Sequence, residues 1–177
     1  GCRVIVNLAP AIDVASSSLA SVDILIVNEG ECLRAAKSLG WTVEGAREED
    51  QNRRDAVSAL NAVSAQDAVS AQSAVNSGDW IAARHGVTTV VTLGSEGAAL
   101  CRPLKEAVRI RSPSVTAVDT VGAGDALVGA FAAWLDAGAT LETALEAGVS
   151  AGALACTRSG AQASIPHRDS ILELMRA

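Results

Sequence analysis

A seven-residue stretch, residues 119–125 (D-T-V-G-A-G-D), stands between a β-rich run and an Ala-rich run with helical apolar spacing. Gly122 and Gly124 therefore lie where a loop turns into a helix N-terminus. Backbone N–H groups there have no intrahelical partner, and the helix dipole adds partial positive charge. An anion can approach closely because glycine has no side chain. Asp125 falls in the first turn, and a carboxylate beside an anion hole suits phosphoryl transfer, whereas the simpler interpretation is a glycine-rich turn with a capping aspartate.

The composition narrows the classes of protein to which this chain can belong. Of its 177 residues 49% are hydrophobic, and no apolar run is long enough to span a membrane. Its net charge of -6 and the lack of a basic patch argue against a nucleic acid partner. No secretory signal opens the chain, and its four cysteines show no paired spacing, which is typical of reduced thiols in a cytosolic protein. We therefore expect a cytoplasmic protein with neither nucleic acid nor membrane as a partner.

Short β-branched runs alternate with stretches of helical spacing along the chain. The runs predicted as strands are residues 3–8, 22–27, 87–93, 98–101, 108–110 and 115–118. The predicted helices are residues 32–39, 126–137, 140–157 and 167–175. Gly138 is expected to end one helix and Thr140 to cap the next. This alternation predicts an α/β fold, a mostly parallel sheet flanked by helices.

Residues 45–79 break this pattern with a low-complexity insertion built on hexapeptides such as A-V-S-A-Q-D. A six-residue step on a helix of about 3.6 residues per turn points Val57, Val63 and Val69 in three directions. No single apolar face is therefore expected, and we predict a poorly anchored helix or a mobile loop without tight packing on a core. A hexapeptide β-helix is the alternative. The whole chain, residues 1–177, is expected to form a single domain that carries this insertion.

Two weaker signals lie at the ends of predicted strands. Asn28 and Glu31 follow residues 22–27, where open α/β sheets bind ligands, but taken alone a loop asparagine with a first-turn glutamate is the preferred interpretation. Gly94 and Gly97 follow residues 87–93, and the loop they form either cradles phosphate or is a plain hairpin turn. Neither signal by itself establishes ligand binding.

Taken in order, several segments resemble the ribokinase-like (PfkB) carbohydrate kinases. Besides D-T-V-G-A-G-D these are V-N-L-A-P-A at residues 6–11, N-E-G-E at 28–31, V-V-T-L-G-S-E-G at 90–97 and C-T-R-S-G-A-Q-A-S-I-P at 156–166. The last segment is most similar to members that phosphorylate ribose. The resemblance covers nearly all the chain except the insertion, and it corresponds only to the C-terminal, nucleotide-binding part of the family. With a first residue Gly1 that almost directly precedes a strand, it indicates a piece of a longer protein.

The resemblance implies roles for the residues of these segments. Asp125 would be the general base, and Gly122, Ala123 and Gly124 would form the anion hole for the γ-phosphate of ATP. The residues implied for the nucleotide are Asn28 and Glu31, which would place magnesium-bound phosphates through water, and Thr92, Gly94 and Gly97, which would line its site. Close relatives of ribokinase also bind potassium. Its implied ligands here are the Asp119 carboxylate, the carbonyls of Val121, Ala155, Arg158 and Gly160, and the Ser164 hydroxyl.

The implied function is transfer of the ATP γ-phosphate to a hydroxyl of a pentose, with ribose as the first expectation. Fructose, another sugar or a nucleoside is the alternative acceptor, and a non-catalytic nucleotide-binding fragment is the alternative outside enzymes. The family's N-terminal half, with its sugar-binding residues and lid strands, has no counterpart in this chain. The edge where that half would pack is expected to favour association, for example as a homodimer.

Overall fold

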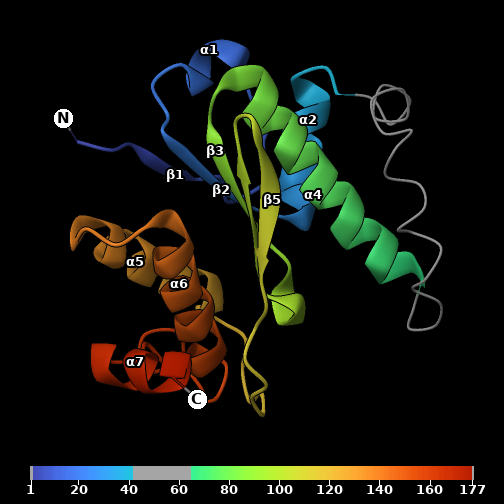
Figure 1. The fold of residues 1–177 in the computed structure, drawn as a ribbon. Coiled ribbons are helices and arrows are strands. Elements are labelled where there is room, and N and C mark those ends of the chain that lie inside the picture. The colour runs from blue at the N-terminus through green and yellow to red at the C-terminus, as the bar shows by residue number, and fades with distance from the viewer. Residues whose placement is uncertain (1, 42–64, 177) are drawn as a thin grey trace. The chain divides into compact units, whose positions relative to one another are not determined.

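The computed structural model of this protein describes residues 2–41 and 65–176, and for residues 65–70 it describes the backbone alone. The strands are β1 (Ile5–Asn7), β2 (Ile24–Asn28), β3 (Thr88–Thr92), β4 (Ala98–Arg102) and β5 (Lys105–Ile110). The helices are α1 (Ser16–Leu19), α2 (Glu29–Ser38), α4 (Ala65–His85), α5 (Ala123–Asp136), α6 (Leu141–Ala155) and α7 (Arg168–Arg176), with a short 3-10 helix η2 at Gly94–Glu96. Strands and helices alternate from β1 to β3, as the sequence predicts, whereas β3, β4 and β5 follow one another without an intervening α-helix and are followed by the three helices α5, α6 and α7 (Figure 1).

One mixed sheet holds the five described strands in the order β1-β2-β3-β4-β5. β1 and β2 pair in parallel, with Ile5 opposite Ile24. β3, β4 and β5 follow one another through short turns, which requires antiparallel pairing between these neighbours. Residues Ile24, Leu25, Ile26 and Val27 of β2 are almost completely buried because helices cover the sheet, as in other α/β folds. The predicted α/β class is confirmed.

Two strand predictions need correction. A short β-branched run such as residues 3–8 is typical of a buried parallel strand, but β1 lies at the edge of the sheet, where Ile5 and Val6 are half-buried and Asn7 is exposed. Residues 115–118 do not form a strand. The Val118 amide donates instead to the carbonyl of Cys156 at the end of α6, at 2.7 Å. A β-branched run makes a strand only where a neighbouring strand is available, and here a helix end takes that place.

The chain forms two compact units. The first comprises the described residues up to Val91 together with Cys101–Ala107, and the second comprises Thr92–Leu100 together with the described residues from Val108 onward. In the first unit α2 packs on β2 and α4 packs on α2. The link between α2 and α4 includes the Cys32 thiol, which lies 3.2 Å from the Ser77 hydroxyl and 3.4 Å from the Ala74 carbonyl. Burial raises the pKa of Cys32 to about 12, so this thiol stays protonated at neutral pH.

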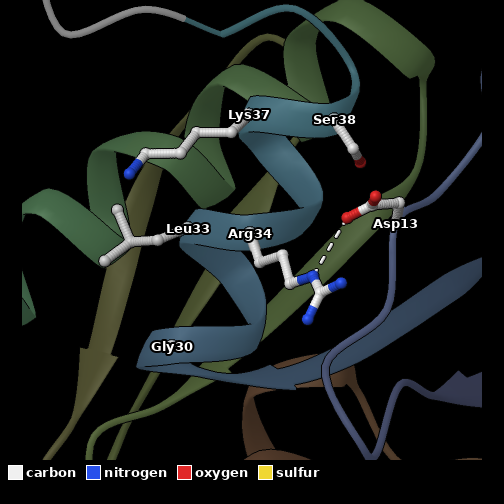
Figure 2. Close-up of a pocket in the computed structure, with 6 residues that line it drawn as sticks. All are labelled: Asp13, Gly30, Leu33, Arg34, Lys37 and Ser38. Atoms are coloured by element: carbon white, nitrogen blue, oxygen red, sulfur yellow. Dashed lines mark hydrogen bonds and ion pairs between the residues drawn. The ribbon is translucent and has the colours of Figure 1, made fainter.

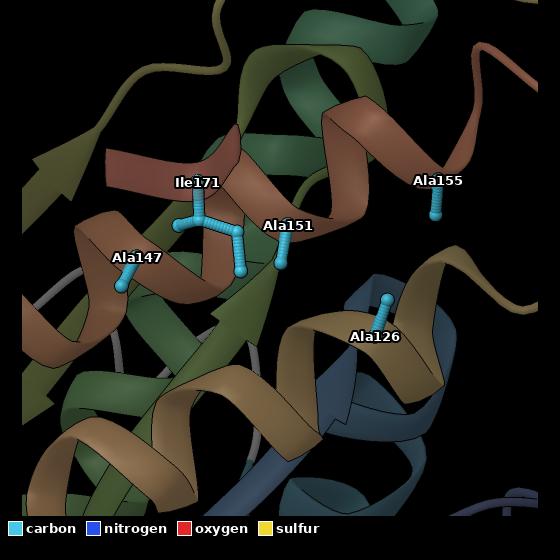
Figure 3. Packing of buried hydrophobic residues seen from close by; sticks show 5 residues of the cluster. All are labelled: Ala126, Ala147, Ala151, Ala155 and Ile171. Atoms are coloured by element: carbon cyan, nitrogen blue, oxygen red, sulfur yellow. The ribbon is translucent and has the colours of Figure 1, made fainter. Parts of the chain in front are cut away.

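The second unit contains a three-helix group in which α6 packs against both α5 and α7. Its small cluster is built from Ala126 of α5, Ala147, Ala151 and Ala155 of α6, and Ile171 of α7 (Figure 3). Alanines allow the helix axes to approach closely. Gly152 extends this effect, because a Cβ there would lie 3.1 Å from the Ala123 carbonyl oxygen. These small residues therefore allow the N-terminus of α5 to pack directly against α6.

The insertion, residues 45–79, was predicted not to pack tightly on a core. This prediction is wrong for residues 71–79, the part that the structure describes with its side chains. Ala71, Ala74, Val75 and Ser77 of α4 are almost completely buried, and Gly78 is buried as well. Positions 71, 74, 75, 78, 81 and 82 follow helical spacing and form a face of small and aliphatic residues. The six-residue spacing of the valines hid this face. Residues 42–64, with Val57 and Val63, lie outside the described residues, as does the Val69 side chain.

Gly78→Ala tests how tightly α4 packs. A Cβ at Gly78 would lie 2.7 Å from Val91 Cγ2 and 3.1 Å from Cys101 Sγ. Gly129→Ala on α5 is the matched control, because a Cβ there meets nothing within 4 Å. Alanine favours both helices by about 1 kcal/mol, while overpacking costs about 1–3 kcal/mol at residue 78 alone. We expect Gly78→Ala to be the less stable variant in urea denaturation, and equal midpoints would contradict this packing.

Candidate functional site

A cavity of about 520 Å³ lies within the second unit. Its walls come from the turn after β3, the extended residues 112–120, the N-terminus of α5 and one face of α6. Hydroxyl side chains supply much of its polar surface, namely Thr92, Ser95, Ser112, Ser114 and Thr120. Leu127, Val149 and Ala153 supply apolar surface. The cavity thus combines apolar surface with a small number of polar groups, as small-molecule sites commonly do.

The glycine turn after β3 is both a hairpin turn and a wall of the cavity. The Leu93 amide donates to the Gly97 carbonyl at 2.8 Å, which closes the turn between β3 and β4. Gly94 and Gly97 have φ angles of 56° and 99°, and both line the cavity. A Cβ at Gly97 would overlap the Ile110 carbonyl oxygen and lie 2.6 Å from the Ser112 nitrogen. The turn can therefore lie directly on the neighbouring backbone only with glycine at this position.

The signature stretch opens α5 with unpaired amides. The helix begins at Ala123, earlier than the sequence predicts, after Gly122 with a φ of 83°. The Ala123 amide donates to the Thr120 carbonyl at 3.3 Å, whereas the amides of Gly124 and Asp125 find no acceptor among the described residues. A Cβ at Gly124 would meet nothing within 4 Å, and both Ala123 and Gly124 line the cavity. Two free N–H groups and the helix dipole thus favour an anion there.

Asp125 is the third residue of α5 and is exposed. It does not line the cavity itself but directly follows Gly124, which does. The first-turn position predicted from the sequence is confirmed. The structure therefore places a carboxylate next to a helix N-terminus that can accept an anion.

Asp119 ties this stretch to residues 158–164. Its Oδ1 accepts the Val121 amide and its Oδ2 accepts the Gly160 amide, each at 3.0 Å. Both hydrogen bonds hold the pKa of the Asp119 carboxyl below its ordinary value, and the bond from the Gly160 amide has the larger effect. The Gly160 carbonyl accepts the Ser164 amide at 3.0 Å, and Ser164 is almost completely buried.

The remaining potassium ligands implied by the sequence lie in the same region. The Arg158 amide donates to the Ala155 carbonyl at 3.4 Å at the end of α6. The Ser164 hydroxyl donates to the Ala161 carbonyl at 3.3 Å. The Asp119 carboxylate, the Ser164 hydroxyl and the carbonyls of Ala155 and Gly160 are oxygens of the kind that suits a hard cation, and each already takes part in a hydrogen bond within the protein. Among the described residues no three histidine, cysteine or acidic side chains gather into a metal-binding group.

Asn28 and Glu31 belong to the first unit, whereas the cavity belongs to the second. They form a capping box at the start of α2: Asn28 Oδ1 accepts the Glu31 amide at 2.9 Å, and Glu31 Oε2 accepts the Asn28 amide at 2.7 Å. The local structural interpretation of N-x-x-E is therefore confirmed. Asn28 Oδ1 and Glu31 Oε2 each keep lone pairs that can accept a further hydrogen bond from a ligand or a water molecule.

The first unit also has a shallow hollow beside α2, lined by Asp13, Gly30, Leu33, Arg34, Lys37 and Ser38 (Figure 2). Arg34 Nε pairs with Asp13 Oδ1 at 2.9 Å, with both side chains exposed. The Ser38 hydroxyl accepts the Val14 amide at 2.9 Å. These contacts pin residues 13 and 14 to α2, and an exposed ion pair of this kind contributes about 0–1 kcal/mol.

Sequence reasoning missed the hydroxyls of Ser112 and Ser114 and the contribution of α6 to the cavity. Two signals were present. The S-P-S tripeptide at residues 112–114 separates β5 from the signature stretch, and Gly148 and Gly152 lie one helical turn apart on α6. Both glycines face α5, since a Cβ at Gly148 would lie 3.0 Å from the Leu127 carbonyl oxygen.

No helix among the described residues combines the length and apolar character that crossing a membrane would require.

Comparisons with known proteins agree on one family. The sequence matches the pfkB family carbohydrate kinases over residues 1–168. It is 30% identical to ribokinase from Haemophilus influenzae over 176 residues. The aligned region covers 99% of this chain and 48% of that protein. The fold is similar to that of ribokinase from Thermotoga maritima, with a TM-score of 0.71 and 28% identity over 99% of this chain and 49% of the other. Arabidopsis thaliana ribokinase complexed with ribose and ATP gives a TM-score of 0.69 with 26% identity, covering 99% and 48%. This chain thus spans about half the length of these relatives.

Proposed function

This chain belongs to the pfkB family of carbohydrate kinases, and from that premise we propose that it is the ATP-binding part of a sugar kinase. The observation that carries the proposal is the N-terminus of α5, where the unpaired amides of Gly124 and Asp125 lie beside a cavity of about 520 Å³. In the proposed site Gly122, Ala123 and Gly124 form the anion hole for the γ-phosphate. Such preorganised donors stabilise the charge that develops during phosphoryl transfer.

Asp125 is the proposed general base. It would accept the proton of the sugar hydroxyl as that oxygen attacks the γ-phosphate held at the same helix end. Thr92, Gly94 and Gly97 line the cavity from the turn after β3 and would contact the nucleotide. ATP supplies the transferred phosphoryl group, and the likeness to a ribokinase complexed with ribose and ATP supports this choice.

Magnesium and potassium fit this chain in different ways. Asn28 and Glu31 already hold each other in a capping box, so we propose that they act on magnesium-bound phosphates through water. Potassium would be held by the Asp119 carboxylate, the Ser164 hydroxyl and carbonyls of residues 121, 155, 158 and 160. The hydrogen bond between Asp119 and Gly160 supports this set, because it brings the two contributing loops together.

The proposed acceptor is a pentose, with ribose first, because two proteins whose sequences match over 99% and 94% of this chain are ribokinases. Fructose, another sugar or a nucleoside is the alternative. A non-catalytic nucleotide-binding fragment is the second candidate function, and the observation that favours it is that the chain spans about half of its relatives. We also propose a cytoplasmic location. The chain would form a homodimer through the edge strand β1, and light scattering would test for that dimer.

Gly124→Val tests the anion hole by filling the space in front of the free amides. A Cβ at Gly124 meets nothing within 4 Å and the residue is helical, so a side chain can start there without backbone strain. We expect affinity for ATP in isothermal titration calorimetry to fall by about 10-fold or more, equivalent to at least about 1.4 kcal/mol. Gly129→Ala on the same helix is the control and should bind like the parent. Unchanged ATP affinity in Gly124→Val would mean that the phosphates do not bind at the N-terminus of α5.

A further inference from the structure

We propose that Asp119 is a positioning residue: its carboxylate clamps the anion-binding turn to residues 158–164 and sets nucleotide affinity even without a monovalent cation. The inference rests on the proposed nucleotide site but assigns Asp119 a task different from cation binding. All the residues involved lie in the second unit.

The clamp consists of two hydrogen bonds to different loops. Asp119 Oδ1 accepts the amide of Val121 within the signature stretch. Asp119 Oδ2 accepts the amide of Gly160, 41 residues further along the chain, and both bonds measure 3.0 Å. Because each carboxylate oxygen already receives one backbone amide, the protein alone joins the two loops. Charged acceptors make stronger hydrogen bonds than neutral ones, which suits such a bridge.

A second contact presses the same two loops together. Gly122, with a φ of 83°, packs on Ala161: a Cβ there would lie 2.9 Å from the Ala161 carbonyl oxygen and 3.2 Å from its methyl carbon. The start of the stretch is fixed as well, because the amides of Val118 and Asp119 donate to the Cys156 carbonyl at 2.7 and 3.2 Å. Residues 158–164 therefore form the support on which Gly122 rests.

The position of Gly122 controls the anion hole because it directly precedes α5. The free amides belong to Gly124 and Asp125, two and three residues further on. If Asp119 no longer held Gly160, Ala161 would no longer hold Gly122, and the first turn of α5 would lose its fixed orientation. Donors held in place bind phosphate better than donors that must be ordered on binding.

The test separates a clamp from a cation ligand. Asp119→Ala and Asp119→Asn would be titrated with ADP and magnesium by calorimetry, once in potassium chloride and once in tetramethylammonium chloride. Asparagine keeps one acceptor oxygen, and Asp136→Asn, an exposed residue at the end of α5, is the matched control. We expect Asp119→Ala to lose about 10- to 100-fold in affinity in both salts, the size of one charged hydrogen bond. Asp119→Asn should fall between it and the parent.

Hydrogen exchange of the nucleotide-free proteins in the potassium-free salt gives an independent readout. The Val121 and Gly160 amides should be protected in the parent and exchange rapidly in Asp119→Ala, whereas the rest of the second unit keeps its protection. A loss of affinity confined to potassium chloride, or unchanged exchange at these two amides, would overturn the clamp. A parent that shows the protected amides but binds no ADP would overturn the proposed function while leaving the loop contact in place.

Discussion

Asp125→Asn is expected to lower the rate of phosphoryl transfer by about 10²- to 10⁴-fold, the usual effect of removing a general base. Asparagine has nearly the same size as aspartate but cannot accept the proton of the attacking hydroxyl. The residue is exposed in the first turn of α5, so the fold and the amides of the anion hole should persist. ATP affinity should therefore change little. The measurement is ADP release with ATP, magnesium and potassium, using ribose, fructose, adenosine or no acceptor.

Asp136→Asn serves as the matched control for this experiment. It removes the same charge from the last residue of the same helix, away from the N-terminal amides, and should release ADP like the parent. Equal turnover by Asp125→Asn and the parent would exclude Asp125 as the base. Flat traces from the parent with every acceptor, combined with measurable ATP binding, would favour the second candidate, a nucleotide-binding fragment.

Gly97→Ala is expected to destabilise the fold more than Gly78→Ala or Gly94→Ala. A Cβ there would overlap the Ile110 carbonyl oxygen, and the φ of 99° is one that alanine rarely adopts. Backbone strain of about 1–3 kcal/mol and overpacking of about 1–3 kcal/mol together predict a loss of about 2–6 kcal/mol. Because a domain is stable by only about 5–15 kcal/mol, this loss is severe.

Gly94→Ala in the same turn separates backbone strain from the clash. Gly94 has a φ of 56°, but a Cβ there meets nothing within 4 Å. A left-handed alanine without a clash should cost about 1–2 kcal/mol. Urea denaturation of both variants measures the difference. Similar midpoints would mean that the turn does not press against the backbone of Ile110.

Local patterns in the sequence were sufficient for the elements whose causes are local. Residues 87–93 and 140–157 carry their strand and helix signals within a few residues, and β3 and α6 form there. The Thr140 hydroxyl accepts the Thr143 amide at 3.2 Å, as an N-cap should. Gly138, with a φ of 86°, follows the last turn of α5 as predicted. The first turn of α5 and its acidic residue were foreseen for the same reason.

Features that depend on distant partners escaped the sequence patterns. Residues 115–118 look like a strand, but no strand forms there, and the amide of Val118 donates to the Cys156 carbonyl at the end of α6. The buried face of α4 became visible only with α2 packed on it, because its small side chains carry little periodic signal.

The sequence by itself located most of the helices and strands, and it placed two glycines and an aspartate at a helix N-terminus. Hydrogen bonding within one turn and apolar periodicity act over a few residues, so a linear pattern records them. Only the tertiary structure decided what that helix end faces. The Asp119 carboxylate meets the Gly160 amide 41 residues away, and Gly97 meets the backbone of Ile110 and Ser112. These contacts arise from close packing in three dimensions, which no spacing along the chain encodes.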